Sequence, residues 1–342
     1  MTETAAGSGA DDLAHALAAC LANGGYADAH VSGLRKLTGG STHDTWAFDL
    51  DYMADGARLS APLILRRNLS TQSLDMEPQA EFALLGWLHD QGLPVAKPVY
   101  CDHEGGVLGM PFVIAQRIIG TDLRKALAQG RAGPDRRAIG AELASLQASV
   151  HAIDASQCPS GIFDPADPAG EVRRWTAPLL AGNTAASPLL RSAIAWLEAN
   201  VPDVSRIAIV HGDFKANNIL WSEQGRPVIL DWELAHPGDP LEDLAWTMLW
   251  STDDDIVCGL LSPDDFIAAY EIASGNQVDR HRLFYWQLYA LVKLCGILRS
   301  GSGTASDADD LGPGHALLSR GSIALEAAIA DYMIAIAGGV AA

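Results

Sequence analysis

Residues 209–220 read IVHGDFKANNIL, and residues 228–233 shortly after them read VILDWE. Two apolar runs in this stretch, residues 218–221 and 227–230, are predicted to be strands. The sequence Glu223-Gln224-Gly225 between them predicts a tight hairpin. This β segment interrupts a part of the chain whose periodicity is otherwise helical, so its polar residues need an explanation.

The polar residues of the hairpin segment suit phosphoryl transfer. Asp213 can orient an attacking hydroxyl and accept its proton. The predicted hairpin brings Asn218 and Asp231 together, and they offer one neutral and one charged oxygen ligand for Mg²⁺. Lys215 is predicted to contact the transferring phosphate, with a solvent-facing lysine as the alternative. Turn chemistry explains a single Asp or Asn, but it does not explain this ordered set.

The pattern His211-Gly212-Asp213-x4-Asn218, followed by Asp231-Trp232-Glu233, resembles the aminoglycoside phosphotransferase and choline kinase superfamily, whose members are relatives of protein kinases. Residues 237–245, PGDPLEDLA, are similar to the Gly-Asp-Pro-x-x-Asp-Leu-Ala motif of that family. The resemblance implies ATP and Mg²⁺ as cofactors. It also implies that Asp243 is a buried carboxylate that anchors the catalytic loop, and His211 is expected to be a structural residue of that loop.

A glycine-rich segment lies between the first two predicted strands, residues 31–37 and 45–50. Glycines let a backbone approach phosphates closely, and hydroxyl side chains offer donors. An ordinary hairpin turn is the alternative, because the segment departs from the G-x-G-x-x-G pattern. The residues predicted to bind phosphate here are Gly39, Gly40, Ser41 and Thr42.

The third predicted strand, residues 62–67, ends in two arginines where kinases carry a phosphate-binding lysine. Strand alternation turns Arg66 and Arg67 to opposite faces. We predict that Arg66 binds the nucleotide phosphates and that Glu81, on the following helix, is its ion-pair partner. A solvated strand end is the alternative. By resemblance alone, backbone groups near Gln116 and Ile118 are expected to contact adenine.

The predicted elements give an α+β, bilobal, protein-kinase-like fold. A small antiparallel sheet with one helix comes first and a larger, mainly helical lobe follows. The resemblance covers residues 31–299. We expect a disordered tail over residues 1–10, an N-terminal nucleotide-binding lobe over 11–118, and a C-terminal catalytic and substrate-binding lobe over 119–342.

Composition excludes several classes of protein. The net charge of −19 argues against a nucleic-acid-binding surface, which would need clustered Lys and Arg. Five scattered cysteines without a C-x-x-C pair indicate neither a zinc site nor a disulfide framework. No apolar run is long enough to span a membrane. The expected protein is cytoplasmic, monomeric or homodimeric, and its partner is a small-molecule substrate.

The function predicted from the sequence is ATP-dependent phosphorylation of a small-molecule hydroxyl. Arg173-Arg174-Trp175 and Tyr289-x3-Lys293-Leu294 resemble the subgroup related to kinase domains fused to acyl-CoA dehydrogenases, which implies a hydroxyacyl-CoA or hydroxy acid. An aminoglycoside or other amino-sugar is the second candidate. Residues 253–255, three aspartates, would supply its carboxylates, unless they form a solvated loop. A catalytically inactive nucleotide-binding scaffold is the candidate from another class, but it would not require Asp213, Asn218 and Asp231 together.

Overall fold

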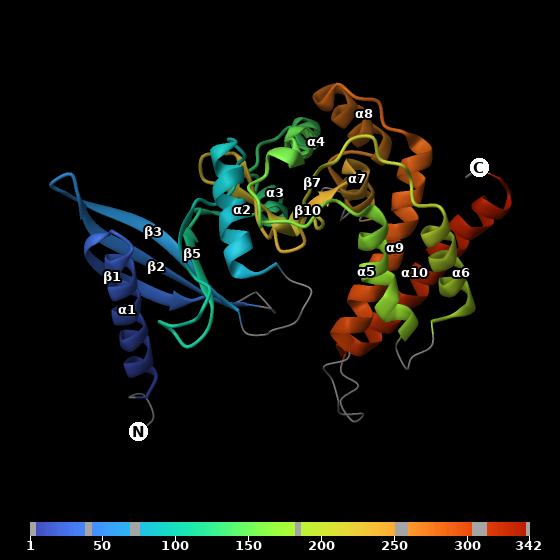
Figure 1. Ribbon diagram of the computed structural model, residues 1–342. Coiled ribbons are helices and arrows are strands. Elements are labelled where there is room, and N and C mark those ends of the chain that lie inside the picture. Colours follow the sequence, from blue (N-terminus) through green and yellow to red (C-terminus); the bar gives the residue numbers. More distant parts are fainter. Residues whose placement is uncertain are drawn as a thin grey trace. The chain divides into compact units, whose positions relative to one another are not determined.

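The computed structural model describes residues 5–37, 43–68, 76–181, 186–249, 259–302 and 313–339. The chain forms two compact units (Figure 1). Unit 1 comprises Met1–Gly133, Gln157–Phe163 and Asn217–Ala235. Unit 2 comprises Pro134–Ser156, Asp164–Ala216 and His236–Ala342. Unit 1 therefore extends beyond residue 118, the predicted boundary, and the chain returns to it for the predicted hairpin.

Unit 1 is built on a five-stranded antiparallel sheet with strand order β1-β2-β3-β5-β4. The elements confirm the predicted small antiparallel sheet with its three leading strands and the helix that follows them. Their bounds are β1 (Ala27–Lys36), β2 (His43–Ala54), β3 (Ala57–Asn68), α2 (Pro78–Asp90), β4 (Pro98–Asp102) and β5 (Phe112–Gln116).

Helix α1 (Ala5–Asn23) covers one face of this sheet through Leu13, Leu17 and Leu21, which pack in one core with Phe48 and Leu65. The sequence predicted a loose tail over residues 1–10, but the helix begins at Ala5. Alanine is the strongest helix former, and it occupies positions 5, 6 and 10, so the helix extends through the glycines between them.

A second, three-stranded sheet of unit 1 has the order β6-β8-β9. Strands β8 (Ile219–Ser222) and β9 (Pro227–Ile229) confirm the predicted hairpin. The sequence did not predict β6 (Gly120–Asp122) or the short helix α3 (Leu123–Ala128). One signal for α3 was present: Asp122 caps it by accepting a hydrogen bond from the Lys125 N–H.

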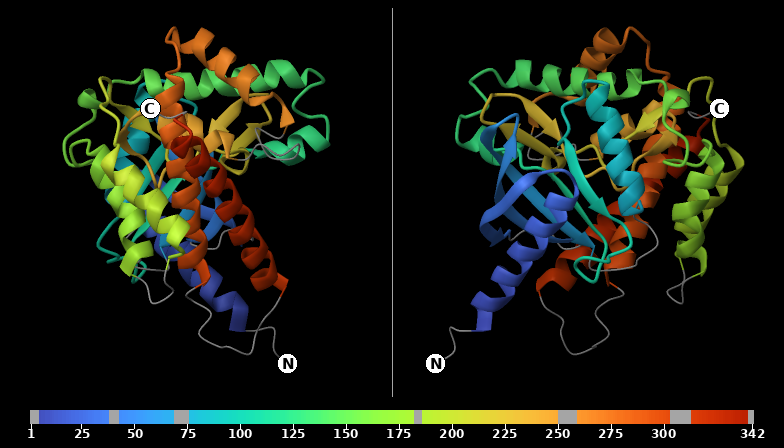
Figure 2. Two further views of the ribbon diagram at one scale, coloured as in Figure 1. Left: turned by 90° about the vertical axis from the view of Figure 1, so that its right-hand side faces the viewer. Right: turned by 60° about the vertical axis from the view of Figure 1, so that its left-hand side comes forward.

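Unit 2 is mainly helical, as predicted, and its central helix α9 packs against α5, α6, α7 and α10. Helices α9 and α10 lie side by side (Figure 2). A two-stranded sheet joins β10 to β7. The elements are α4 (Arg136–Ala152), α5 (Pro168–Ala181), α6 (Pro188–Ala199), β7 (Ala208–Val210), β10 (His236–Gly238), α7 (Pro240–Met248), α8 (Pro263–Ser274), α9 (Arg280–Ser302) and α10 (Pro313–Ala337).

Among the described residues, no helix combines the length and the apolar character that crossing a bilayer would require.

Candidate functional site

A cavity of about 630 Å³ opens in unit 1, and all of its lining residues belong to that unit. Its volume lies within the range of small-molecule sites, roughly 300–1,000 Å³. Apolar residues of the sheet, such as Ile64, Val113 and Ala115, form part of the lining. The cavity also has a polar set contributed by the sheet, by α2 and by the hairpin segment, namely Arg66, Glu81, Asn218 and Asp231.

Arg66 is the predicted phosphate-binding cation, and it lines this cavity. Its Nη1 donates to Oε1 of Glu81 at 2.6 Å, so the predicted ion pair is present. Burial opposes the charge, but the carboxylates of Glu81, Asp231 and Glu233 outweigh it and raise the pKa of Arg66. The guanidinium therefore stays cationic on a wall of the cavity that also holds carboxylates.

Arg67 lies on the opposite face of β3, as strand alternation predicts, and it does not line the cavity. It pairs with Asp44, which also binds Lys36 with Nζ and Oδ1 2.8 Å apart. Burial raises the pKa of Asp44, but hydrogen bonds from Lys36, Trp46 and Arg67 outweigh that effect and lower it to about 2. Arg67 is thus part of a partly buried ion-pair cluster on the other face of the strand, and it serves as a natural control for Arg66.

Asn218 and Asp231 both line the cavity, and the Leu230 N–H donates to the Asn218 carbonyl at 2.8 Å. Asp231 has φ +66°, a left-handed conformation that is uncommon outside glycine. Such backbone strain, of order 1–3 kcal/mol, clusters at functional sites. An amide oxygen and a carboxylate on one cavity wall fit a divalent cation that binds oxygen ligands, as Mg²⁺ does.

The predicted adenine-contacting segment also borders the cavity. The N–H groups of Gln116 and Arg117 donate within the protein, to Lys97 and Pro62 carbonyls at 2.8 and 2.9 Å. Ile118 differs from both: within the described part of the chain, no hydrogen bond involves its N–H or its C=O. Both groups are therefore available to a ligand in the cavity.

Two predicted groups of residues lie outside the described residues. They are the phosphate-binding candidates Gly39, Gly40, Ser41 and Thr42, and the three aspartates at positions 253–255.

In unit 2, Asp243 holds the backbone of the predicted catalytic loop. It is fully buried near the start of α7 and accepts from the N–H groups of His211 at 2.6 Å and Gly212 at 2.8 Å. Burial raises the pKa of Asp243. A hydrogen bond from the His151 side chain and one from the His211 backbone outweigh burial, so the pKa lies below its usual value. The resemblance implied this anchoring role. Gly212 has φ +81°, a conformation that favours glycine at this turn.

The side chain of Asp213 is held at both carboxylate oxygens. Oδ1 accepts from Trp246 Nε1 at 2.8 Å, and Oδ2 lies 2.8 Å from Lys215 Nζ. Its own N–H donates to His211 Nδ1 at 3.2 Å, which agrees with the structural role expected of His211. Trp246 was not among the predicted site residues, although it follows Asp243 by three positions on α7 and therefore shares its helix face.

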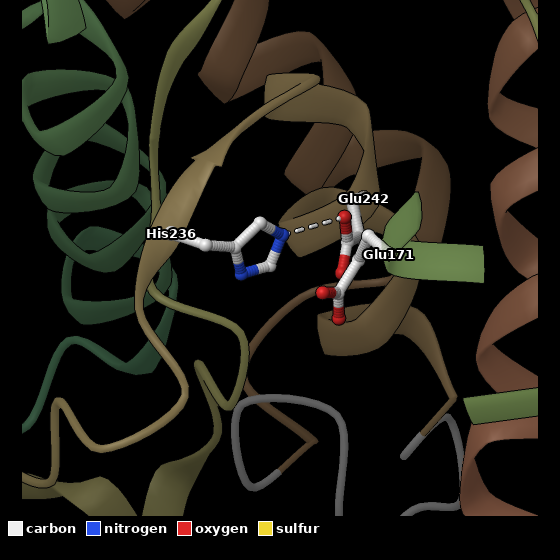
Figure 3. Close-up of side chains that lie close together, drawn as sticks. All are labelled: Glu171, His236 and Glu242. Atoms are coloured by element: carbon white, nitrogen blue, oxygen red, sulfur yellow. Dashed lines mark hydrogen bonds and ion pairs between the residues drawn. The ribbon is translucent and has the colours of Figure 1, made fainter. Parts of the chain in front are cut away.

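A partly buried cluster in unit 2, formed by Glu171, His236 and Glu242, was also not predicted (Figure 3). Each residue places a ligand atom within 4.8 Å of the others. His236 Nε2 lies 3.1 Å from Glu242 Oε2, and Lys293 Nζ lies 3.5 Å from Glu242 Oε1. Burial lowers the pKa of His236, but Glu242 and Glu171 outweigh it and raise the pKa to about 9. The histidine is therefore a cation between two carboxylates.

This pKa predicts that folding stability falls between about pH 6.5 and pH 9. His236 binds its proton more tightly in the folded state, so its contribution is complete below pH 6.5 and is lost as the pH rises through 9. The loss of one linked proton lowers the free energy of unfolding by at most about 1.4 kcal/mol per pH unit. Urea titrations of wild type and His236→Gln across this window measure the difference. If the free energy of unfolding varied with pH in the same way in wild type and in His236→Gln, His236 would carry no linked proton.

Comparison with known proteins gives one family and several relatives. The family model described as the phosphotransferase enzyme family matches residues 33–284, which span both units. Acyl-CoA dehydrogenase family member 11 of Mus musculus is 32% identical over 177 residues, which are 50% of this chain and 22% of that protein. Acyl-CoA dehydrogenase family member 10 of Mus musculus is 26% identical over 175 residues, which are 50% of this chain and 16% of that protein. The matches thus span a minor part of both relatives.

Solved structures confirm the protein-kinase-like fold. A putative aminoglycoside phosphotransferase of Ralstonia eutropha has a TM-score of 0.69 at 21% identity, covering 93% of this chain and 97% of that one. A thermostable mutant of the aminoglycoside phosphotransferase APH(4)-Ia, in ternary complex with AMP-PNP and hygromycin B, has a TM-score of 0.60 at 17% identity, covering 89% of this chain and 93% of that one.

Proposed function

Because the chain belongs to the phosphotransferase enzyme family, we propose that it transfers the γ-phosphoryl group of Mg²⁺-ATP to a hydroxyl of a small molecule. The observation that carries this proposal is the cavity of unit 1. It combines a cation, Arg66, with two oxygen ligands suited to Mg²⁺, Asn218 and Asp231. Asp213 precedes Asn218 by five residues, so their Cα atoms are at most about 18 Å apart.

In this proposal the nucleotide occupies the cavity with its base toward Ile118, whose N–H and C=O are available for hydrogen bonds. Arg66 binds phosphate oxygens through its planar fork while Glu81 orients it. Asn218 and Asp231 hold Mg²⁺. A Mg²⁺ ion held there would supply positive charge that balances the charge of the phosphates.

Asp213 acts on the acceptor. Its carboxylate orients the acceptor hydroxyl and accepts the proton, while the hydroxyl oxygen forms the new bond to the γ-phosphorus and ADP leaves. Hydrogen bonding by Trp246 and pairing with Lys215 fix the carboxylate before the acceptor binds. Little covalent work is required, so the rate depends on positioning and on charge neutralisation.

A hydroxyacyl-CoA or a similar hydroxy acid is the acceptor that we propose. The relatives named as acyl-CoA dehydrogenase family members support this class. An aminoglycoside or other amino-sugar is the alternative, supported by the fold neighbours. Such a polycation would need carboxylates for its ammonium groups. Glu171 and Glu242 are already paired with His236, Lys293 and Arg174, so these two carboxylates do not suit that purpose.

The test is a screen of Mg²⁺-ATP consumption against hydroxyacyl-CoAs, amino-sugars and amino alcohols, with phosphorylated product identified by mass spectrometry. Turnover with a hydroxyacyl-CoA supports the acceptor proposed here, and turnover with an amino-sugar supports the alternative. ATP binding without turnover of any acceptor would instead indicate an inactive nucleotide-binding scaffold.

The proposed metal site predicts that ATP stabilises the protein much more with Mg²⁺ than with EDTA. Mg²⁺ keeps several waters and depends on substrate phosphates, so Asn218 and Asp231 alone bind it weakly. A ligand that binds only the folded state raises Tm by mass action. Thermal unfolding with ATP and either Mg²⁺ or EDTA measures this, and Asp231→Asn should reduce the difference. Equal Tm shifts in both conditions would contradict the assignment.

A further inference from the structure

Lys293 lies in the middle of α9 and is 1% exposed, which is rare for a lysine. Its Nζ is surrounded by three aromatic rings: the ring centroids of Trp175, Trp246 and Tyr289 lie 5.2, 5.1 and 5.9 Å away. Aromatic faces at such distances attract a cation, so this box favours a charged ammonium in a buried place. The box also explains the motifs Arg173-Arg174-Trp175 and Tyr289-x3-Lys293, which supply two rings and the cation.

The ammonium makes a contact with the catalytic loop. Lys293 Nζ donates to the carbonyl oxygen of Gly212 at 3.1 Å, and this carbonyl belongs to the peptide that joins Gly212 to Asp213. Asp243 holds the N–H of the same glycine. The peptide groups on both sides of Gly212 are thus fixed, one by a carboxylate of α7 and the other by a cation of α9.

Two further anchors of the loop come from α7. Trp246 holds the Asp213 carboxylate, and Thr247 Oγ1 donates to the Phe214 carbonyl at 3.0 Å. Lys293 adds an anchor from a second helix, α9. Trp246 takes part both in anchoring the loop and in the aromatic box, because its indole N–H donates to Asp213 and its ring faces Lys293.

The cluster of Glu171, His236 and Glu242 provides the counter-charge for this buried lysine. Trp175 Nε1 and the Tyr289 hydroxyl donate to Glu171 Oε1 at 2.8 and 3.2 Å, so the box and the cluster form one network. A divalent metal does not fit there. Lys293 already lies 3.5 Å from Glu242 Oε1, and His236 bridges toward the same carboxylate, so a metal would add positive charge beside two cations.

We propose that Lys293 is a positioning residue for Asp213: it fixes the Gly212–Asp213 peptide, and the Glu171–His236–Glu242 cluster balances its charge. The link to catalysis rests on the proposed phosphotransferase function. Lys293 touches neither the nucleotide cavity nor the Asp213 carboxylate, so its effect is on the geometry of the base and not on ATP binding.

Amide hydrogen exchange of the loop tests this inference without any acceptor. The variant Lys293→Met/Glu242→Gln removes one positive and one negative charge together, which keeps the buried charge balanced and protects folding. We expect the amides of Gly212 and Asp213 to exchange at least tenfold faster than in wild type. Once an acceptor is known, kcat should fall at least tenfold while KM for ATP stays within twofold.

Two comparison variants isolate the lysine. Tyr285→Phe removes another buried donor of α9, the hydroxyl that donates to the Leu197 carbonyl at 2.9 Å, and it should not accelerate exchange in residues 211–214. Glu242→Gln alone removes part of the counter-charge but keeps the hydrogen bond from Lys293 to Gly212, so it should accelerate exchange less than the double variant. Unchanged loop exchange in the double variant, or equal acceleration in Tyr285→Phe, would overturn the inference.

The two proposals can fail separately. If no acceptor is phosphorylated, the proposed function fails, and the exchange result still decides whether Lys293 holds the loop. A rise in Tm with Zn²⁺ that is lost in Glu171→Gln would assign the cluster to a metal and overturn its role as counter-charge.

Discussion

Asp213→Asn is expected to lower kcat by about 100-fold or more while ATP binding stays unchanged. Asparagine keeps the shape of the side chain and can still accept from Trp246 Nε1, so the loop geometry is preserved. It cannot accept the acceptor's proton. ATP affinity should not change, because Asp213 does not line the cavity of unit 1, where we propose that the nucleotide binds. Single-turnover kinetics and calorimetric titration with Mg²⁺-ATP measure the two quantities.

Asp203→Asn is the matched control for this prediction, because Asp203 is an exposed aspartate of unit 2 ten positions upstream in the chain. It should retain wild-type kcat and wild-type ATP affinity. Turnover near the wild-type rate in Asp213→Asn would remove Asp213 from the mechanism. A large loss of ATP binding would mean that the aspartate acts on the nucleotide and not on the acceptor.

Local patterns in the sequence predicted much of this fold. Apolar runs bounded by turn residues predicted the first three strands of unit 1, and helical periodicity predicted that unit 2 is mainly helical. The hairpin of β8 and β9 followed from two short apolar runs around Gly225. Strand alternation also separated Arg66 from Arg67, since a period of two fixes the face of each residue.

The unpredicted parts depend on contacts between distant segments. Trp246 and Lys293 reach the catalytic loop from two different helices, and no local pattern links them to Asp213. Glu171, His236 and Glu242 come from three separate elements, so their proximity exists only after packing. Strand β6 is a similar case: three residues become a strand because they pair with β8.

Arg66→Ala should weaken ATP binding by about 1.5–3 kcal/mol, the value of a charge-assisted hydrogen bond. The prediction follows from the position of Arg66 on the cavity wall, where Glu81 directs its guanidinium. Adenosine affinity should hardly change, because adenosine has no phosphates. Arg66→Lys should fall between wild type and alanine, since lysine keeps the charge and loses the planar fork. Calorimetric titrations with ATP and with adenosine measure each variant.

Arg67→Ala decides between a specific site and a general effect of positive charge. Arg67 is the next residue on the same strand, but its guanidinium pairs with Asp44 on the opposite face. Its removal should therefore leave both ligands bound as in wild type. If Arg67→Ala weakened ATP binding as much as Arg66→Ala, long-range attraction to the nucleotide would explain both losses. If neither variant weakened it, a different cation would hold the phosphates, and Lys215 would be the first residue to test. A loss confined to Arg66, and to ATP over adenosine, would support phosphates that lie against this arginine, because Arg66 lines the cavity, Arg67 does not, and adenosine lacks phosphates.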